Sequence, residues 1–121
     1  MISVKKLVLV VEHNDCVRSM MSRALRTYGM DVIAFDQPDD LYHFDVRKNP
    51  ISLIIYDMSS LSRMDKAVQL LNASSTVPVI FTASEPISRN VTKRISCHYN
   101  FLIKPFDFIR LIDSVWEVIT Y

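Results

Sequence analysis

Four polar side chains, each directly after or at the end of a short apolar run, are the residues of this chain best suited to chemistry. Two are acids, one carries a hydroxyl and one an ammonium: Glu12, Asp57, Thr82 and Lys104. A carboxylate such as Asp57 can act as a nucleophile if nearby cations neutralise the charge that develops on the attacked group. Lys104 would supply one such cation, and Glu12 could help Asp57 to hold a divalent ion.

The four apolar runs predict the elements that must position these groups. They cover residues 7–11, 51–57, 77–81 and 99–103. Short continuous apolar runs are typical of strands buried on both faces of a sheet. In an open parallel sheet, the ligand site lies beyond the carboxyl ends of the strands. We therefore expect an acid, a second acid, a hydroxyl and an ammonium to meet in one crevice.

Helical patterns alternate with these strands. Asn14 or Asp15 can cap a helix that runs to about Thr27, and Gly29, the only glycine of the chain, is expected to end it. A further strand is predicted at 31–35. Four more helices are expected, from near Asp39 to 49, at 64–73, at 87–97 and from about 106 to 119. The order is (βα)5, which predicts an α/β, doubly wound parallel sheet with helices on both faces.

Composition limits the possible functions. The chain has 121 residues, half of them hydrophobic, which predicts a single domain over 1–121. A net charge of +1 gives no electrostatic footprint for nucleic acid or an anionic membrane, and no run approaches the roughly 20 apolar residues of a membrane span. Cys16 and Cys97 have no metal or redox spacing, so we expect free thiols and a cytoplasmic location.

The strand ends also carry a recognisable combination of motifs. These are Val10-Val11-Glu12-His13, Asp57 after the third strand, Thr82-Ala83 after the fourth and Lys104-Pro105-Phe106 after the fifth. Over its whole length the chain resembles the receiver domains of two-component response regulators. The resemblance implies a flavodoxin-like sheet with strand order 2-1-3-4-5. It also implies that the protein is not an enzyme but acts in phosphorelay signal transduction, with a histidine kinase or histidine phosphotransfer protein as its partner.

The resemblance also implies roles for individual residues. Asp57 would accept the phosphoryl group, and Mg²⁺ would be held by Glu12, Asp57 and the backbone carbonyl of Ser59. Thr82 would be the switch hydroxyl and Phe101 the rotating aromatic residue.

Two departures from the family pattern bear on the metal. His13 stands where the family usually has its second acid, and imidazole is a poor ligand for a hard cation such as Mg²⁺. After Asp57, Leu61 replaces the usual proline, and Met64-Asp65-Lys66 brings the acid one residue late with no glycine. We expect Mg²⁺ binding to be weakened by an order of magnitude or more and the loop after Asp57 to be rebuilt.

Several residues have a structural interpretation beside the functional one. Asp57 and Lys104 could form a purely structural salt bridge, Thr82 could be an ordinary strand-end hydroxyl, and Phe101 could belong to the core. His13 could be a tolerated surface residue, a pH-sensitive substitute for the acid or a block to the metal.

Two function classes follow from these alternatives. One is a phosphorelay receiver. The other is a pseudo-receiver that binds a partner or dimerises without phosphorylation, through the face of the helix at 87–97, the strand at 99–103 and the final helix, which has more apolar residues than one core-facing stripe needs. An enzyme of flavodoxin type would want a glycine-rich first loop, which a chain with one glycine lacks.

Overall fold

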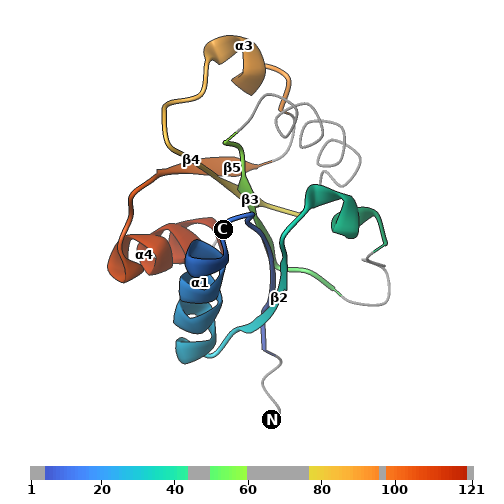
Figure 1. Cartoon of the computed structure of the whole chain (residues 1–121), viewed down its shortest axis with the longest axis vertical. Coiled ribbons are helices and arrows are strands. Elements are labelled where there is room, and N and C mark those ends of the chain that lie inside the picture. The colour runs from blue at the N-terminus through green and yellow to red at the C-terminus, as the bar shows by residue number, and fades with distance from the viewer. Residues whose placement is uncertain (1–4, 44–49, 60–76, 96–97, 120–121) are drawn as a thin grey trace.

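The chain folds around one five-stranded parallel sheet (Figure 1). A computed structural model describes residues 5–43, 50–59, 77–95 and 98–119. The strands lie in the order β2-β1-β3-β4-β5, which confirms the flavodoxin-like order 2-1-3-4-5. Their bounds are β1 Leu7–Val11, β2 Asp31–Phe35, β3 Leu53–Asp57, β4 Val79–Ala83 and β5 Tyr99–Ile103.

Helices cover both faces of the sheet, as predicted. Helices α1 (Asp15–Thr27) and α4 (Phe108–Ile119) lie together on one face, and α3 (Arg89–Thr92) lies on the other (Figure 1). Side chains alternate across a strand, so Val8 and Val10 pack against α1 and α4, whereas Leu9 and Val11 pack on the opposite face. Each fully buried aliphatic side chain of these two cores contributes roughly 1.5–3 kcal/mol to folding.

Both ends of α1 are fixed by the residues that the sequence indicates. The Asn14 side chain caps the amino end, where its Oδ1 accepts the backbone N–H of Val17 at 3.0 Å. At the carboxyl end Gly29 has φ +85°, its N–H donates to the carbonyl of Arg26, and the N–H of Met30 donates to that of Leu25. This is a Schellman cap, whose left-handed position favours glycine. The prediction of both helix ends is confirmed.

Three helical segments differ from the sequence-based expectation. The helix expected from Asp39 begins as a 3₁₀ helix, η1 (Pro38–His43), and its expected continuation over 44–49 lies outside the described residues. In the described part of the helix expected at 87–97, the α-helix covers Arg89–Thr92, because the N–H groups of Arg94 and Ile95 donate to carbonyls three residues back and tighten the turn. Residues 96–97 lie outside the described ranges. The final helix begins at Phe108, not 106, where Asp107 caps the N–H of Arg110.

Some expectations fall on residues that the structure does not describe. They are the helix at 64–73, the altered positions Leu61 and Met64-Asp65-Lys66, and Cys97. Cys16 is described and is a free, exposed thiol, as predicted. Within the described ranges, no helix combines the length and the apolar character needed to cross a membrane.

Candidate functional site

The four polar residues singled out in the sequence converge at the carboxyl edge of the sheet. Successive side chains of a strand point to opposite faces of the sheet, so residues two apart share a face. Val10 and Leu102 face α1 and α4, and Glu12 and Lys104, two residues further on, therefore lie on that same face. Asp57 and Thr82 are neighbours in register across β3 and β4. Backbone bonds fix the strand ends, because the N–H of Met58 donates to the carbonyl of Thr82 and that of Lys104 to the carbonyl of Ala83, both at 2.8 Å.

Lys104 joins the two acids. Its Nζ lies 2.6 Å from Oε1 of Glu12 and 3.2 Å from Oδ1 of Asp57. The side chains of Glu12 and Asp57 are only 1% and 2% exposed, whereas that of Lys104 keeps 19% exposure. Both carboxylates therefore share one ammonium that still reaches the solvent. The peptide bond between Lys104 and Pro105 is cis.

The ionisation of Lys104 reflects this arrangement. Burial of the ammonium acts to lower its pKa, but the hydrogen bond that it donates to Glu12 and the negative charges of Asp57 and Glu12 together outweigh that effect. The pKa of Lys104 is therefore raised above the ordinary value of 10.5. The ammonium is charged throughout the neutral range, as neutralisation of an anion at Asp57 would require.

The second oxygen of Asp57 has a partner that the sequence did not indicate. Ser59 donates its hydroxyl hydrogen bond to Oδ2 of Asp57 at 2.8 Å. We expected Ser59 to serve through its backbone carbonyl, as a metal ligand. A serine two residues after an acid could have predicted this hydrogen bond, because serine hydroxyls in turns often bond to near neighbours in the sequence.

Thr82 lies inside β4, not beyond its end, and is completely buried. Its Oγ1 has no hydrogen-bond partner among the described residues. A buried hydroxyl without a partner is costly, by about 1–3 kcal/mol, and is uncommon in folded proteins. This hydroxyl stands beside Asp57 in the sheet register and is free to accept or donate a bond.

Phe101 lies on the other face of the sheet from these four residues. It is half-buried, and its ring contacts Phe81 at a centroid distance of 5.7 Å and Tyr99 at 5.4 Å. The structure thus places Phe101 in an aromatic group at the edge strand β5. Its predicted switch role stays a prediction.

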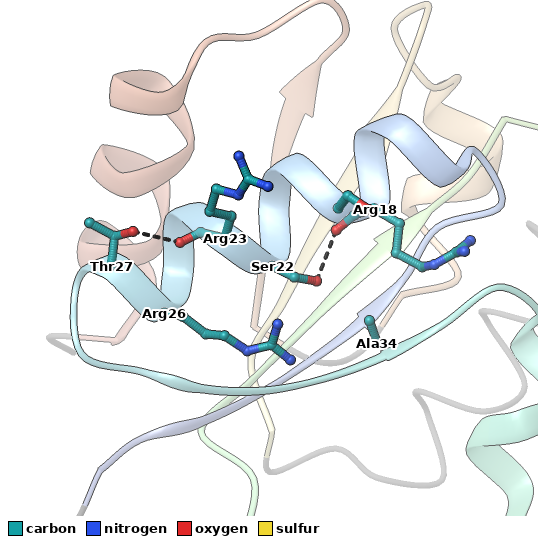
Figure 2. Close-up of a pocket in the computed structure, with 7 residues that line it drawn as sticks. Arg18, Ser22, Arg23, Arg26, Thr27 and Ala34 are labelled. Carbon is teal, nitrogen blue, oxygen red and sulfur yellow. Dashed lines mark hydrogen bonds between the residues drawn. The ribbon is translucent and has the colours of Figure 1, made fainter.

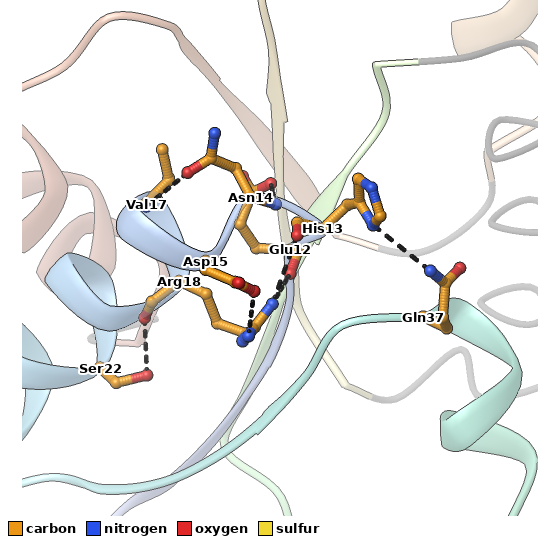
Figure 3. A network of polar contacts seen from close by, with 8 residues as sticks. All are labelled: Glu12, His13, Asn14, Asp15, Val17, Arg18, Ser22 and Gln37. Carbon is orange, nitrogen blue, oxygen red and sulfur yellow. Dashed lines mark hydrogen bonds and ion pairs between the residues drawn. The ribbon is translucent and has the colours of Figure 1, made fainter.

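His13 turns away from the carboxylates. It is exposed, and its Nδ1 lies 3.3 Å from Nε2 of Gln37, which precedes η1 (Figure 3). Oε2 of Glu12 accepts the backbone N–H of Asn14 at 3.0 Å. Arg18 donates to the carbonyls of Glu12 and His13 at 3.0 and 3.4 Å and pairs with Asp15 at 2.6 Å (Figure 3). This network, which the sequence analysis missed, fixes the turn that carries Glu12.

The charges of the site sum to −1, from Glu12, Asp57 and Lys104. Within residues 5–43, 50–59, 77–95 and 98–119, no three His, Cys, Asp or Glu side chains are grouped so as to hold a metal ion. At this site, Glu12 and Asp57 are the two described carboxylates that can offer oxygen ligands to a hard cation. Such a cation would share these carboxylates with Lys104.

The fold is shared with solved structures of response regulators. Chemotaxis protein CheY4 of Vibrio cholerae matches with a TM-score of 0.81 and 19% identity, over 95% of this chain and 99% of the other. A response regulator from Thermotoga maritima matches at 0.80 and 16% identity, over 98% and 100%. A response regulator receiver protein from Burkholderia phymatum matches at 0.77 and 24% identity, over 96% of each.

In sequence, the chain shows less similarity to known proteins than it does in fold. No family model matches the chain. Nodulation protein W of Bradyrhizobium diazoefficiens is 28% identical over 116 residues, which cover 93% of this chain and 51% of that protein. The chain thus spans about half the length of this relative. Together with the observed strand order, the structural comparisons show that the chain has the fold of CheY-like response-regulator receiver domains.

Proposed function

We propose that this chain is the receiver of a response regulator in two-component phosphorelay signal transduction, and that Asp57 accepts a phosphoryl group from a histidine kinase or histidine phosphotransfer protein. The observation that carries the proposal is the buried carboxylate of Asp57 at a strand end, with Oδ1 3.2 Å from the ammonium of Lys104. A nucleophile and the cation that neutralises an incoming phosphoryl group are thereby held in one crevice.

The transfer is a displacement at phosphorus. An oxygen of Asp57 forms the new O–P bond while the N–P bond of the donor phosphohistidine breaks. The electron pair of that bond stays on the imidazole nitrogen, which then takes up a proton. Lys104 moves its charge toward the phosphoryl oxygens, and the hydroxyls of Ser59 and Thr82 are the nearby neutral donors.

Mg²⁺ is part of the proposal, with Glu12 and Asp57 as its protein ligands and water filling the remaining positions. Bound there, it would neutralise negative charge on the transferring group. We propose that this metal site is weak, because His13 stands where the second acid is expected, and its side chain faces Gln37. The backbone carbonyl of Ser59 remains a proposed third ligand.

The protein donor would approach beside Lys104. A cavity of about 450 Å³ is lined there by Val17, Met20, Ser84, Lys104, Pro105 and Phe106. Its walls are mainly apolar and come from α1, from the segment between β5 and α4, and from Ser84 directly after β4. An apolar surface next to the nucleophile suits a helical protein partner, since packing of such a surface supplies affinity while Lys104 supplies charge.

A second function is favoured by different observations. The four oxygens of Glu12 and Asp57 each lie against a partner, in Lys104, Ser59 or the N–H of Asn14, so the two carboxylates are paired without a ligand. On α4 and β5, Ile109, Trp116 and Ile103 are 65%, 40% and 38% exposed. We propose as the alternative a pseudo-receiver that binds a partner or forms a homodimer through the face of α3, β5 and α4, without phosphorylation.

Labelling of the purified chain separates these functions. With a small phosphodonor and Mg²⁺, the wild type should gain one phosphoryl group by intact mass, and Asp57→Asn should gain none. Asp113→Asn, an exposed acid on α4, is the matched control and should be labelled normally. No labelling of the wild type, together with a dimer in sedimentation that Trp116→Ala dissociates, would favour the pseudo-receiver. Label that persists in Asp57→Asn would place the phosphoacceptor elsewhere.

A further inference from the structure

A groove between α1 and β2 carries three arginines, and one of them, Arg18, also belongs to the network around Glu12 described above. Its volume is about 590 Å³, and its lining includes Arg18, Ser22, Arg23, Arg26 and Ala34 (Figure 2). Pockets that hold small molecules have volumes of roughly 300–1,000 Å³. The groove is therefore large enough for a small ligand. It shares Arg18 with the turn that carries Glu12, and it shares no lining residue with the proposed partner surface beside Lys104.

Helical spacing produces the groove. Arg18, Ser22 and Arg26 are four residues apart and so form one stripe on α1. Ala34 of β2 lies below this stripe, and the side chains of Arg18 and Arg26 flank it (Figure 2). Because the side chain of Ala34 is a single methyl group and β2 is an edge strand, space remains between the two arginines. Arg23 lines the groove one residue further round the helix.

The positive charge of the groove is only partly neutralised. Arg18 pairs with Asp15, but neither Arg23 nor Arg26 has an ion pair with a carboxylate among the described residues. Arg26 donates one bond, to the neutral carbonyl of Val32 at 3.2 Å. The described lining of the groove contains no acid. Arg23 and Arg26 are three residues apart, where like charges on a helix repel, so an anion between them would remove an unfavourable interaction.

The free hydrogen-bond donors of the groove are mainly guanidinium groups. The hydroxyls of Ser22 and Thr27 donate to backbone carbonyls of their own helix, those of Arg18 and Arg23, both at 2.8 Å. A guanidinium presents five donors in a planar fork that matches phosphate oxygens. No aromatic side chain lines the described groove as a stacking platform for bases, and the whole chain has a net charge of only +1. These features favour a small anion over nucleic acid.

We propose that this arginine groove binds a small anion with two or more phosphate groups, held through the phosphates themselves. Arg26 comes eight positions after Arg18, which is about 12 Å along the helix axis, so a linked chain of phosphates reaches more of the groove than one phosphate does. The inference is independent of phosphorylation at Asp57.

The test is a titration of the whole chain with inorganic tripolyphosphate, followed by amide NMR and calorimetry at fixed salt. We expect shifts centred on α1 and on β2 near Ala34, and binding at least several-fold tighter than that of inorganic phosphate. Arg26→Gln should weaken binding roughly tenfold, the loss expected for one charge-assisted contact. Arg110→Gln, an exposed arginine on α4, makes the same charge change away from the groove and should leave affinity within about twofold.

A second variant tests the cavity and not the charge. Ala34→Met should fill the groove and weaken binding without altering net charge, with folding checked by the thermal midpoint. Equal losses in Arg26→Gln and Arg110→Gln would overturn the proposal, as would shifts centred on Asp57 and Lys104. Absence of binding at millimolar tripolyphosphate would also overturn it. So would tighter binding of a single-stranded oligonucleotide or of anionic lipid vesicles than of tripolyphosphate, since the groove would then serve a macromolecular surface.

Discussion

Replacing Lys104 with methionine should destabilise the domain strongly, because two buried acids share its ammonium. The Nζ atom lies 2.6 Å from Glu12 and 3.2 Å from Asp57, and both acids are at most 2% exposed. Removing one partner of a fully buried ion pair costs about 3–5 kcal/mol. Lys104 retains 19% exposure, so water can partly replace it, and we expect a loss of about 2–4 kcal/mol at neutral pH.

Urea unfolding measures this loss. With an m-value of about 1–3 kcal/mol/M, a loss of about 3 kcal/mol lowers the midpoint by roughly 1–3 M. Lys93→Met, which removes an exposed lysine at the end of α3, is the control and should change stability by less than about 0.5 kcal/mol. In a background of Glu12→Gln with Asp57→Asn, the effect of Lys104→Met should largely disappear, since the buried charges are gone.

The pH dependence follows from the raised pKa of Lys104. A group whose folded pKa is raised stabilises the fold fully below its unfolded pKa, here 10.5, and loses that contribution as pH rises through the folded value. The stability difference between wild type and Lys104→Met should therefore be constant at neutral pH and shrink above 10.5. Equal midpoints for Lys104→Met and Lys93→Met, or a difference that grows in alkali, would refute the shared ion pair.

Three further predictions concern individual residues of the site and the helix cap. His13→Asp should tighten Mg²⁺ binding by roughly tenfold in a titration followed by NMR, because it adds a carboxylate ligand; unchanged affinity would assign the weakness to the segment after Ser59. Thr82→Val should leave the thermal midpoint unchanged or raise it, since it removes a buried hydroxyl without a partner, while beryllofluoride shifts should no longer reach Phe101. A lower midpoint would mean that the hydroxyl is bonded after all. Gly29→Ala should cost about 1 kcal/mol in urea unfolding because φ is +85°, although the added methyl group meets no atom within 4 Å; a cost below a few tenths would show that the cap tolerates a side chain.

The strands and the strand-end chemistry were predictable from sequence because they depend on local pattern. Strands β1 and β5 coincide with the predicted runs, since a strand buried on both faces must be continuously apolar. The parallel arrangement then brings the ends together, so Asp57 and Lys104 meet as expected although they are 47 positions apart in the sequence. The caps at Asn14 and Gly29 were equally local.

The sequence could not predict which side chains from different segments contact one another. Lys104 lies closer to Glu12 than to Asp57, a difference set by side-chain placement and not by pattern. From the sequence, His13 could be a tolerated surface residue, a pH-sensitive substitute for the acid or a block to the metal. The position of Gln37 beside it shows in which direction it points. For the segment at 87–97, apolar spacing predicted a long helix, whereas i→i+3 bonds end the α-helix at Thr92.

Strand β2 forms one open edge of the sheet, and its outward backbone groups matter for how copies of the chain meet. The N–H of Asp31 and the carbonyl of Phe35 bond toward β1, so by alternation the carbonyl of Val32 faces outward. The Arg26 guanidinium donates a hydrogen bond to that carbonyl, and the exposed acid Asp31 is the preceding residue in β2. A strand from another molecule that added here would have to displace the guanidinium, so β2 is protected from edge-to-edge aggregation by a side chain of its own neighbouring helix.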